Sequence, residues 1–260
     1  MFCAEKCAAV LLALCALVAT VEAEDFRIAT KVFIGPEVEE GEEVEPVSET
    51  TTLFRGGTVY DFLGDSQQIA VFRKPLGSAP GRFILLDPQR KIRTELSTGQ
   101  LQKFATGLKA WSAAQDDPLL KFNSNPNFQE SWDASSAELT LASPVVQYRV
   151  VTEPMPSRQA ALQYREFSDW YARLGALLYP GSTPPFARLA VNAALSEYQA
   201  MPTEVHLRIA EYKSLRKDDI VMRSEHTITW RLSKADQDRI DQAGAYLVQF
   251  PEVELGEFQR

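Results

Sequence analysis

The sequence predicts a single α+β domain built on an antiparallel sheet. Between residues 50 and 96, five short runs rich in β-branched and aromatic residues follow one another, separated only by turns that hold Gly, Asp or Pro. This spacing is typical of an antiparallel meander and leaves no room for the crossover helices of a βαβ fold. Later segments carry apolar residues at steps of three and four, which indicates amphipathic helices.

The first 23 residues have the order of charge, apolar run and small residues found in secretory signals. Lys6 precedes an apolar or small run from Ala8 to Thr20, and Val21 and Ala23 form a small-residue pair. The run is shorter than the roughly 20 residues that a membrane-spanning helix needs. We therefore expect cleavage after Ala23 and export to a bacterial periplasm or to the exterior.

All three cysteines, Cys3, Cys7 and Cys15, lie within this segment. The exported chain, residues 24–260, is therefore expected to have neither a disulfide nor a thiol nucleophile. Lipidation of Cys15 is the poorer alternative to soluble export, because Leu14 stands where lipoprotein signals have a small residue.

The exported chain is acidic. Without Lys6, Glu5 and Glu22, the 27 basic and 35 acidic residues become 26 and 33, which leaves a formal charge of −7. This balance argues against a nucleic-acid partner, whose phosphates require clustered Lys and Arg. It argues equally against charge-driven binding to anionic membranes.

The first half of the exported chain is expected to be mainly β. A strand at 26–34 leads to an acidic loop, 37–49, which holds seven glutamates. We interpret the loop as solvated, with a metal-binding loop as the lesser alternative because the interleaved Asp and Asn of calcium sites are missing. The meander at 50–96 is followed by a helix at 98–112 and an irregular stretch at 115–135.

The second half is expected to place a helical hairpin between two pairs of strands. Strands at 138–143 and 145–153 come before the hairpin, and long strands at 202–213 and 219–232 follow it. The first helix of the hairpin carries one apolar stripe: Ala160, Tyr164, Phe167, Tyr171, Leu174 and Leu178. The second helix is expected on Phe186, Leu189, Ala193 and Leu195. A closing helix begins after Ser233, which can cap it together with Asp236.

Paired carboxylates are the first candidate for catalysis. Glu166 and Asp169 are three residues apart and share a helix face, as an acid–base pair could. Arg165 and Arg173, however, each lie four residues from Asp169, the spacing of ordinary ion pairs on a helix surface. We interpret the group as a surface ladder, because perturbed carboxylates need burial that this face does not promise.

The two histidines are the next candidates. His206 and His226 fall on the two long strands, whose apolar faces require odd positions of one strand to oppose even positions of the other. The imidazoles are therefore predicted to point to opposite faces, and a two-histidine metal site is the lesser hypothesis. The sequence also lacks a serine-nucleophile motif and a phosphate-binding glycine loop. We predict no catalytic residue, no metal and no cofactor, and a protein that is not an enzyme.

The layout resembles the periplasmic lipoprotein and lipid carriers of the Lol type (LolA-like and LppX-like proteins). The resemblance is carried by FRIATKVFI, TTLFRGGTVYDFL, QIAVFRK, GRFILLDPQRKIRTEL and the helix at 98–112. It implies a curved, half-open antiparallel sheet, barrel-like, with helices packed on its concave face. The glutamate-rich insertion and the late, aromatic hairpin depart from the pattern, so no binding residues are carried over.

The function expected from these observations is the binding or transport of an apolar or amphipathic ligand, such as a lipid or a lipoprotein acyl chain. The alternative is an envelope-associated structural or protein-interaction domain with a filled core, and a hydrolase is the third hypothesis. Trp170, Tyr179 and Phe186 lie off the apolar stripe or beside the hairpin loop. These three are the predicted ligand-binding residues.

Overall fold

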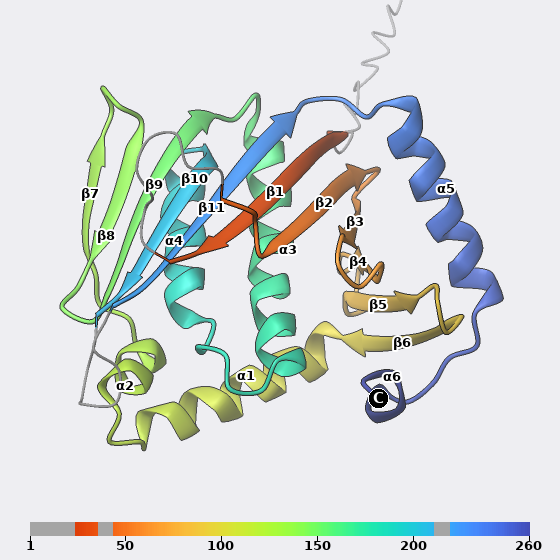
Figure 1. Ribbon diagram of the computed structural model, residues 1–260, viewed down its shortest axis with the longest axis horizontal. Helices are drawn as coiled ribbons and strands as arrows, with labels where there is room; N and C mark the ends of the chain where they lie inside the picture. Colours follow the sequence, from red (N-terminus) through yellow and green to blue (C-terminus); the bar gives the residue numbers. More distant parts are fainter. Residues whose placement is uncertain (1–23, 36–43, 211–218) are drawn as a thin grey trace, which may run out of the picture.

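The computed structural model describes residues 24–35, 44–210 and 219–260. The expected export signal and most of the acidic loop lie outside these ranges. In the described part, eleven strands form one antiparallel sheet in the order β6-β5-β4-β3-β2-β1-β11-β10-β9-β8-β7 (Figure 1). The first strand therefore lies at the centre of the sheet, beside the last. The α+β class and the antiparallel sheet are confirmed.

The meander forms one half of the sheet, as predicted. Its strands are β1 (Phe26–Ile34), β2 (Ser48–Arg55), β3 (Thr58–Leu63), β4 (Ile69–Arg73), β5 (Arg82–Asp87) and β6 (Ile92–Ser97). The acidic loop ends earlier than predicted, because Ser48 and Glu49 already belong to β2. Glu49 lies opposite Lys31 of β1, and their charged groups are 3.7 Å apart.

The stretch at 115–135 is more regular than expected. It follows α1 (Thr98–Ala113) and contains α2 (Pro118–Ser124) and β7 (Gln129–Asp133). Asp117 starts α2, since its carboxylate accepts a hydrogen bond from the Leu120 amide at 2.9 Å. The edge strand β7 is mostly exposed, so it lacks the alternation of apolar and polar residues by which strands are predicted.

The remaining elements follow the predicted order. They are β8 (Glu138–Ala142), β9 (Val146–Pro154), α3 (Arg158–Leu178), α4 (Phe186–Glu197), β10 (Ala200–Ile209), β11 (Ile220–Thr229), α5 (Lys234–Gln249) and α6 (Leu255–Phe258). Ser233 and Asp236 form the predicted capping box at the start of α5. None of the helices within the described ranges is both long enough and apolar enough to cross a bilayer.

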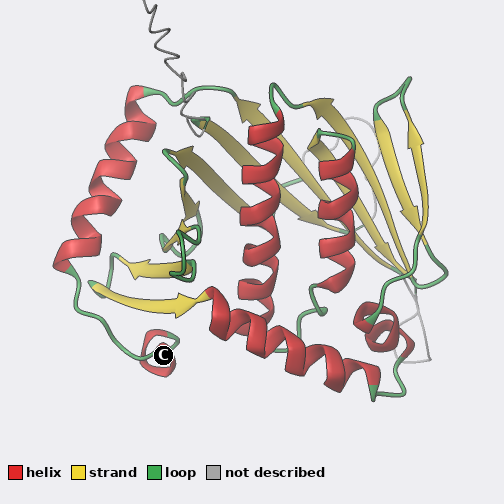
Figure 2. Ribbon diagram, turned by 180° about the vertical axis from the view of Figure 1, so that it is seen from behind, coloured by secondary structure: helices red, strands yellow, loops and turns green. Residues whose placement is uncertain are grey.

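Helices pack on both faces of the meander half. Alternate residues of a strand point to opposite faces, and in β4 the residues Ala70 and Phe72 join the core beneath α3 while Ile69 and Val71 join the core beneath α5. Figure 2 shows α3 and α4 in front of the sheet, on the face that α5 does not cover, and α1 running below them. Four of the five residues of β4 are consequently buried.

A second core lies at the other half of the sheet, between α4 and strands β8 to β10. The side of α4 that packs there agrees only in part with the predicted one, since Leu195 is buried as expected. Ala187, Val191 and Ala194 are buried, whereas Leu189 and Ala193 are only partly covered. The contact face of α4 therefore combines the small side chains of Ala187 and Ala194 with the larger ones of Val191 and Leu195.

Candidate ligand site

Helix α3 carries the aromatic side chains that define the site. Ser157 caps its first turn, with its hydroxyl accepting from the Ala160 amide at 3.1 Å. The predicted stripe is confirmed at four of its six positions, and the other two are partly buried. The buried positions are Ala160, Tyr164, Phe167 and Leu174, and the partly buried ones are Tyr171 and Leu178. The Phe167 ring is the centre of the aromatic packing. Its neighbours, by centroid distance, are Tyr171 at 5.1 Å, Phe54 at 5.6 Å, Phe72 at 6.1 Å and Phe83 at 6.4 Å.

A cavity of about 450 Å³ lies between this hairpin and the central strands, and we call it the hairpin cavity. Its floor is continuous across the sheet, because residues that lie opposite each other in an antiparallel pair share a face. Val32 of β1 is opposite Ser224 of β11, which is opposite Val205 of β10. In the neighbouring row Met222 is opposite Leu207. The apolar residues of these rows form what we call the apolar floor. Polar side chains line the rest of the same face: Thr30, Thr50, Thr52, Asp61, Ser224 and His226.

The roof of the hairpin cavity comes from α3, from α4 and from the loop between them. Tyr164, Phe167 and Tyr171 contribute aromatic rings, and Thr183 and Arg188 contribute polar groups. The site thus combines an apolar floor, an aromatic roof and a polar end at the α3–α4 loop.

One polar group on the floor is the His226 imidazole. Its Nδ1 lies 3.0 Å from the Thr30 hydroxyl and its Nε2 lies 3.0 Å from the Ser224 hydroxyl. A neutral imidazole has one donor and one acceptor nitrogen, and a hydroxyl can complement either. Burial, and to a lesser degree the charge of Arg188, lower the pKa of His226 to about 3. The side chain is therefore neutral at pH 7.

A second polar group on this face is Asp61 of β3, which is 2% exposed. Its carboxylate accepts hydrogen bonds from the Thr52 hydroxyl at 2.7 Å and from the Tyr171 hydroxyl at 2.6 Å. Burial raises the pKa of Asp61, and the two hydroxyl donors oppose that effect. The Asp61–Tyr171 bond ties the middle of α3 to the sheet at the edge of the hairpin cavity.

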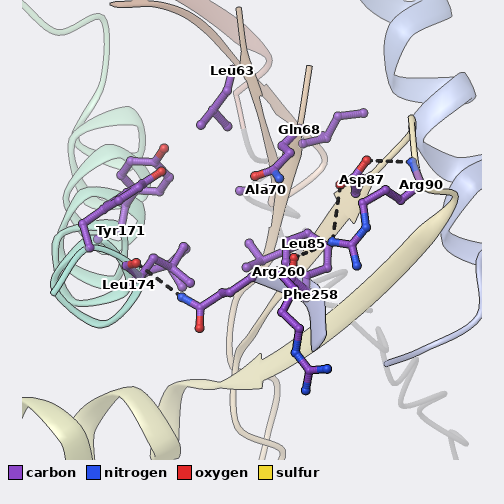
Figure 3. A pocket seen from close by; sticks show the side chains of 15 residues that line it. Leu63, Gln68, Ala70, Leu85, Asp87, Arg90, Tyr171, Leu174, Phe258 and Arg260 are labelled. Atoms are coloured by element: carbon purple, nitrogen blue, oxygen red, sulfur yellow. Dashed lines mark hydrogen bonds and ion pairs between the residues drawn. The ribbon is translucent and has the colours of Figure 1, made fainter. Parts of the chain in front are cut away.

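Two further cavities lie around the second half of α3. One, the C-terminal cavity, measures about 440 Å³ and lies between α3, strands β4 and β5, and α6. Figure 3 shows Tyr171 and Leu174 on one side of it and Leu85 and Phe258 across from them. The Arg90 guanidinium donates to the Phe258 carbonyl oxygen at 2.7 Å, which holds α6 in place.

The other, the loop cavity, measures about 250 Å³ and lies beneath the α3–α4 loop. The three cavities share wall residues. Tyr171 lines the hairpin and C-terminal cavities, Gly175 and Tyr179 line the C-terminal and loop cavities, and Arg188 lines the loop and hairpin cavities. The last two turns of α3 therefore border three cavities, although Leu174 is buried and Leu178 packs against the main core.

The predicted ligand residues fall in different surroundings. Tyr179 is 58% exposed and lines the loop and C-terminal cavities. Trp170 packs at the margin of the main core with the Arg173 guanidinium 4.9 Å from its ring centroid. Phe186 lies under Lys109, whose ammonium is 5.8 Å from its centroid. Neither Trp170 nor Phe186 lines the hairpin, C-terminal or loop cavity, and the ligand role of all three stays a prediction.

The two histidines lie on opposite faces, as predicted. His206 is opposite Arg223 in the register, which places His226, three positions further along β11, on the other face. His206 bonds Arg149 and Glu204 there, away from the cavity.

The predicted ladder of charges on α3 is only partly an ion-pair ladder. Arg165 lies 3.9 Å from the Asp169 carboxylate, but Arg173 donates to the Asp169 backbone carbonyl oxygen instead. Asp169 also accepts a hydrogen bond from Asn192 of α4 at 2.9 Å, and burial raises its pKa. Burial likewise raises the pKa of Glu166. The face is more covered than expected because α4 packs against α3, and Asp169 links the two helices.

Sequence reasoning missed the polar residues of the hairpin cavity, chiefly Asp61 and Arg188. Asp61 carried a signal, because it is the one charged residue in the strand TVYDFL. Arg188 carried none, since an arginine in the first turn of an amphipathic helix is ordinary.

No protein-family model matches the chain, and no curated protein is similar to it in sequence. Its function therefore has to be inferred from the chemistry of the site.

Proposed function

We propose that the protein is an exported, non-enzymatic carrier that holds an apolar or amphipathic ligand, such as a lipid or a lipoprotein acyl chain. In this proposal the sheet is a curved, half-open barrel and the hairpin of α3 and α4 packs on its concave face. The observation that carries the proposal is the hairpin cavity. Its volume of about 450 Å³ falls within the range of roughly 300–1,000 Å³ that is usual for ligand sites.

The chemistry of the lining favours a hydrocarbon chain. Val32, Val205, Leu207 and Met222 line the floor, and removing apolar surface from water contributes about 25 cal/mol per Å². Most buried polar groups of the floor already bond to each other, as His226 does with its two hydroxyl neighbours and Asp61 with Thr52. A ligand chain could therefore cover them without leaving donors or acceptors unpaired.

A structural or interaction protein of the envelope is the second candidate, because one half of the core is densely filled. Phe26 and Phe54 stack with centroids 4.0 Å apart, and both are completely buried. In that case the hairpin cavity would be a packing defect with no ligand.

Uptake of a fluorescent apolar probe such as N-phenyl-1-naphthylamine distinguishes the two candidates. The carrier should bind the probe saturably, and Leu207→Trp, which fills the floor, should abolish uptake. The matched control is Leu162→Trp, since Leu162 is exposed on α3 and does not line the hairpin cavity. Absence of saturable binding, or an equal loss in both variants, would favour the structural candidate.

A further inference from the structure

The polar end of the hairpin cavity is formed by Arg188 and Thr183. Both residues line the hairpin cavity and the loop cavity, so they stand where the two spaces adjoin. Arg188 belongs to the first turn of α4 and is partly buried. The end of the apolar floor is therefore marked by a guanidinium and a hydroxyl.

The Arg188 guanidinium makes no hydrogen bond or ion pair within residues 24–35, 44–210 and 219–260, although it carries five donors. Its charge acts on three neighbours, His226, Tyr148 and Asp169. The first is neutral at pH 7, and the second is a buried phenol. Asp169 is occupied by Arg165 and Asn192. The donors of the Arg188 guanidinium are therefore available to an anion that enters the cavity.

Other groups at this end have the same preference. Thr183 is exposed and its hydroxyl can donate to a ligand oxygen, and α4 starts without a side-chain cap. Free amides in the first turn of a helix favour negative charge. Arg223 borders the hairpin cavity, but its side chain lies on the opposite face of the sheet, where it pairs with Glu204 and Glu225. Arg188 is thus the group that an anionic ligand would meet.

We infer that the hairpin cavity takes a single-chain amphiphile with an anionic head group, a carboxylate or a phosphate, which Arg188 holds while the chain covers the apolar floor. The planar guanidinium can bond two oxygens of either head group at once. This inference rests on the proposed carrier function and adds the charge of the ligand and the end at which its head lies.

The test compares ligands that differ only in the head group. Dodecanoate, dodecyl phosphate and dodecanol are titrated as competitors of the fluorescent apolar probe. We expect at least one of the two anions to bind about tenfold or more tightly than dodecanol. Arg188→Gln should weaken binding of that anion by about 10- to 100-fold and leave dodecanol unchanged. The preferred anion identifies the head group as carboxylate or phosphate.

The matched control is Arg158→Gln, which removes the same charge from an exposed position on α3 that lines none of the three cavities. Arg188→Lys keeps the charge and should recover part of the anion affinity, so it serves where the glutamine variant folds poorly. Equal affinity for anions and dodecanol, or an equal effect of Arg158→Gln, overturns the head-group inference and leaves the carrier standing. Binding of none of the three ligands overturns both.

Discussion

The two halves of α3 belong to one regular helix but have different surroundings. In the first half, Ala160, Tyr164 and Phe167 are at most 7% exposed and pack into the aromatic core, and of the three cavities this half borders only the hairpin cavity. In the second half, Tyr171, Gly175 and Tyr179 border cavities on three sides. The apolar stripe runs through both halves without a change of spacing. A regular stripe thus shows that a helix has a covered side, but it does not show how completely that side is filled.

The largest effect should come from the packed half. Phe167→Ala removes a ring that contacts four other aromatic rings, and deletion of a buried aromatic side chain costs about 3–5 kcal/mol. Chemical denaturation measures the loss. Phe186→Ala, at a partly buried position on α4, should cost less and yet weaken probe uptake. Equal losses in the two variants, with uptake unchanged, would contradict both the packed core and the ligand role of Phe186.

The next effect concerns the floor of the hairpin cavity and depends on pH. The pKa of His226 is lowered from its usual 6.5 to about 3 in the folded protein, so the unfolded chain binds a proton more readily between these values. The contribution to stability is complete above about pH 6.5 and is lost as the pH falls toward 3, by up to about 1.4 kcal/mol per pH unit.

Urea denaturation at several pH values between 7 and 4 measures this dependence. His226→Gln cannot be protonated in this range, so its stability should fall less steeply than that of the wild type. Carboxylates titrate in both proteins, so the difference between the stability–pH curves of the wild type and the variant is due to His226. Parallel curves would mean that the imidazole is solvated and that the floor is open to water.

A smaller effect is expected at the joint between the two halves. Asp61→Ala leaves the Thr52 and Tyr171 hydroxyls without their acceptor and should cost about 1–3 kcal/mol. Asp61→Asn keeps a polar partner for both hydroxyls without a buried charge, so its cost should be smaller. Burial raises the pKa of Asp61, which means that the ionised wild type loses stability as the pH rises through that value. The stability of Asp61→Asn relative to the wild type should therefore increase with pH. If Asp61→Asn lost as much stability as Asp61→Ala, the carboxylate itself would be needed.

Much of the fold could be predicted from the sequence because its signals are local. The five strands between residues 50 and 96 are joined by short turns, and the cap of α5 is a contiguous motif. The missed elements, α2 and β7, are a single capped turn and an exposed edge strand, and neither has a periodic apolar pattern.

The site was less predictable because it depends on pairs that are distant in sequence. Asp61 meets Tyr171 across 110 positions, and His226 meets Thr30 across 196. The opposite orientation of the two histidines was nevertheless predictable, since the apolar faces of β10 and β11 fix the register. The empty volume itself leaves no trace in the sequence, because the same stripe would cover a filled core.

The smallest effect tests the hollow half of α3 directly. A Cβ added at Gly175 would meet nothing within 4 Å, so Gly175→Ala should stabilise the protein by about 0.5–1 kcal/mol through helix propensity alone. Gly107→Ala on the exposed side of α1 also meets nothing within 4 Å and should give a similar gain. The two positions should separate when the side chain is large. Gly175→Phe would add a ring beside the C-terminal and loop cavities and should reduce uptake only of probe that enters those two cavities, whereas Gly107→Phe should leave uptake unchanged. A destabilisation by Gly175→Ala would mean that the second half of α3 is as tightly packed as the first.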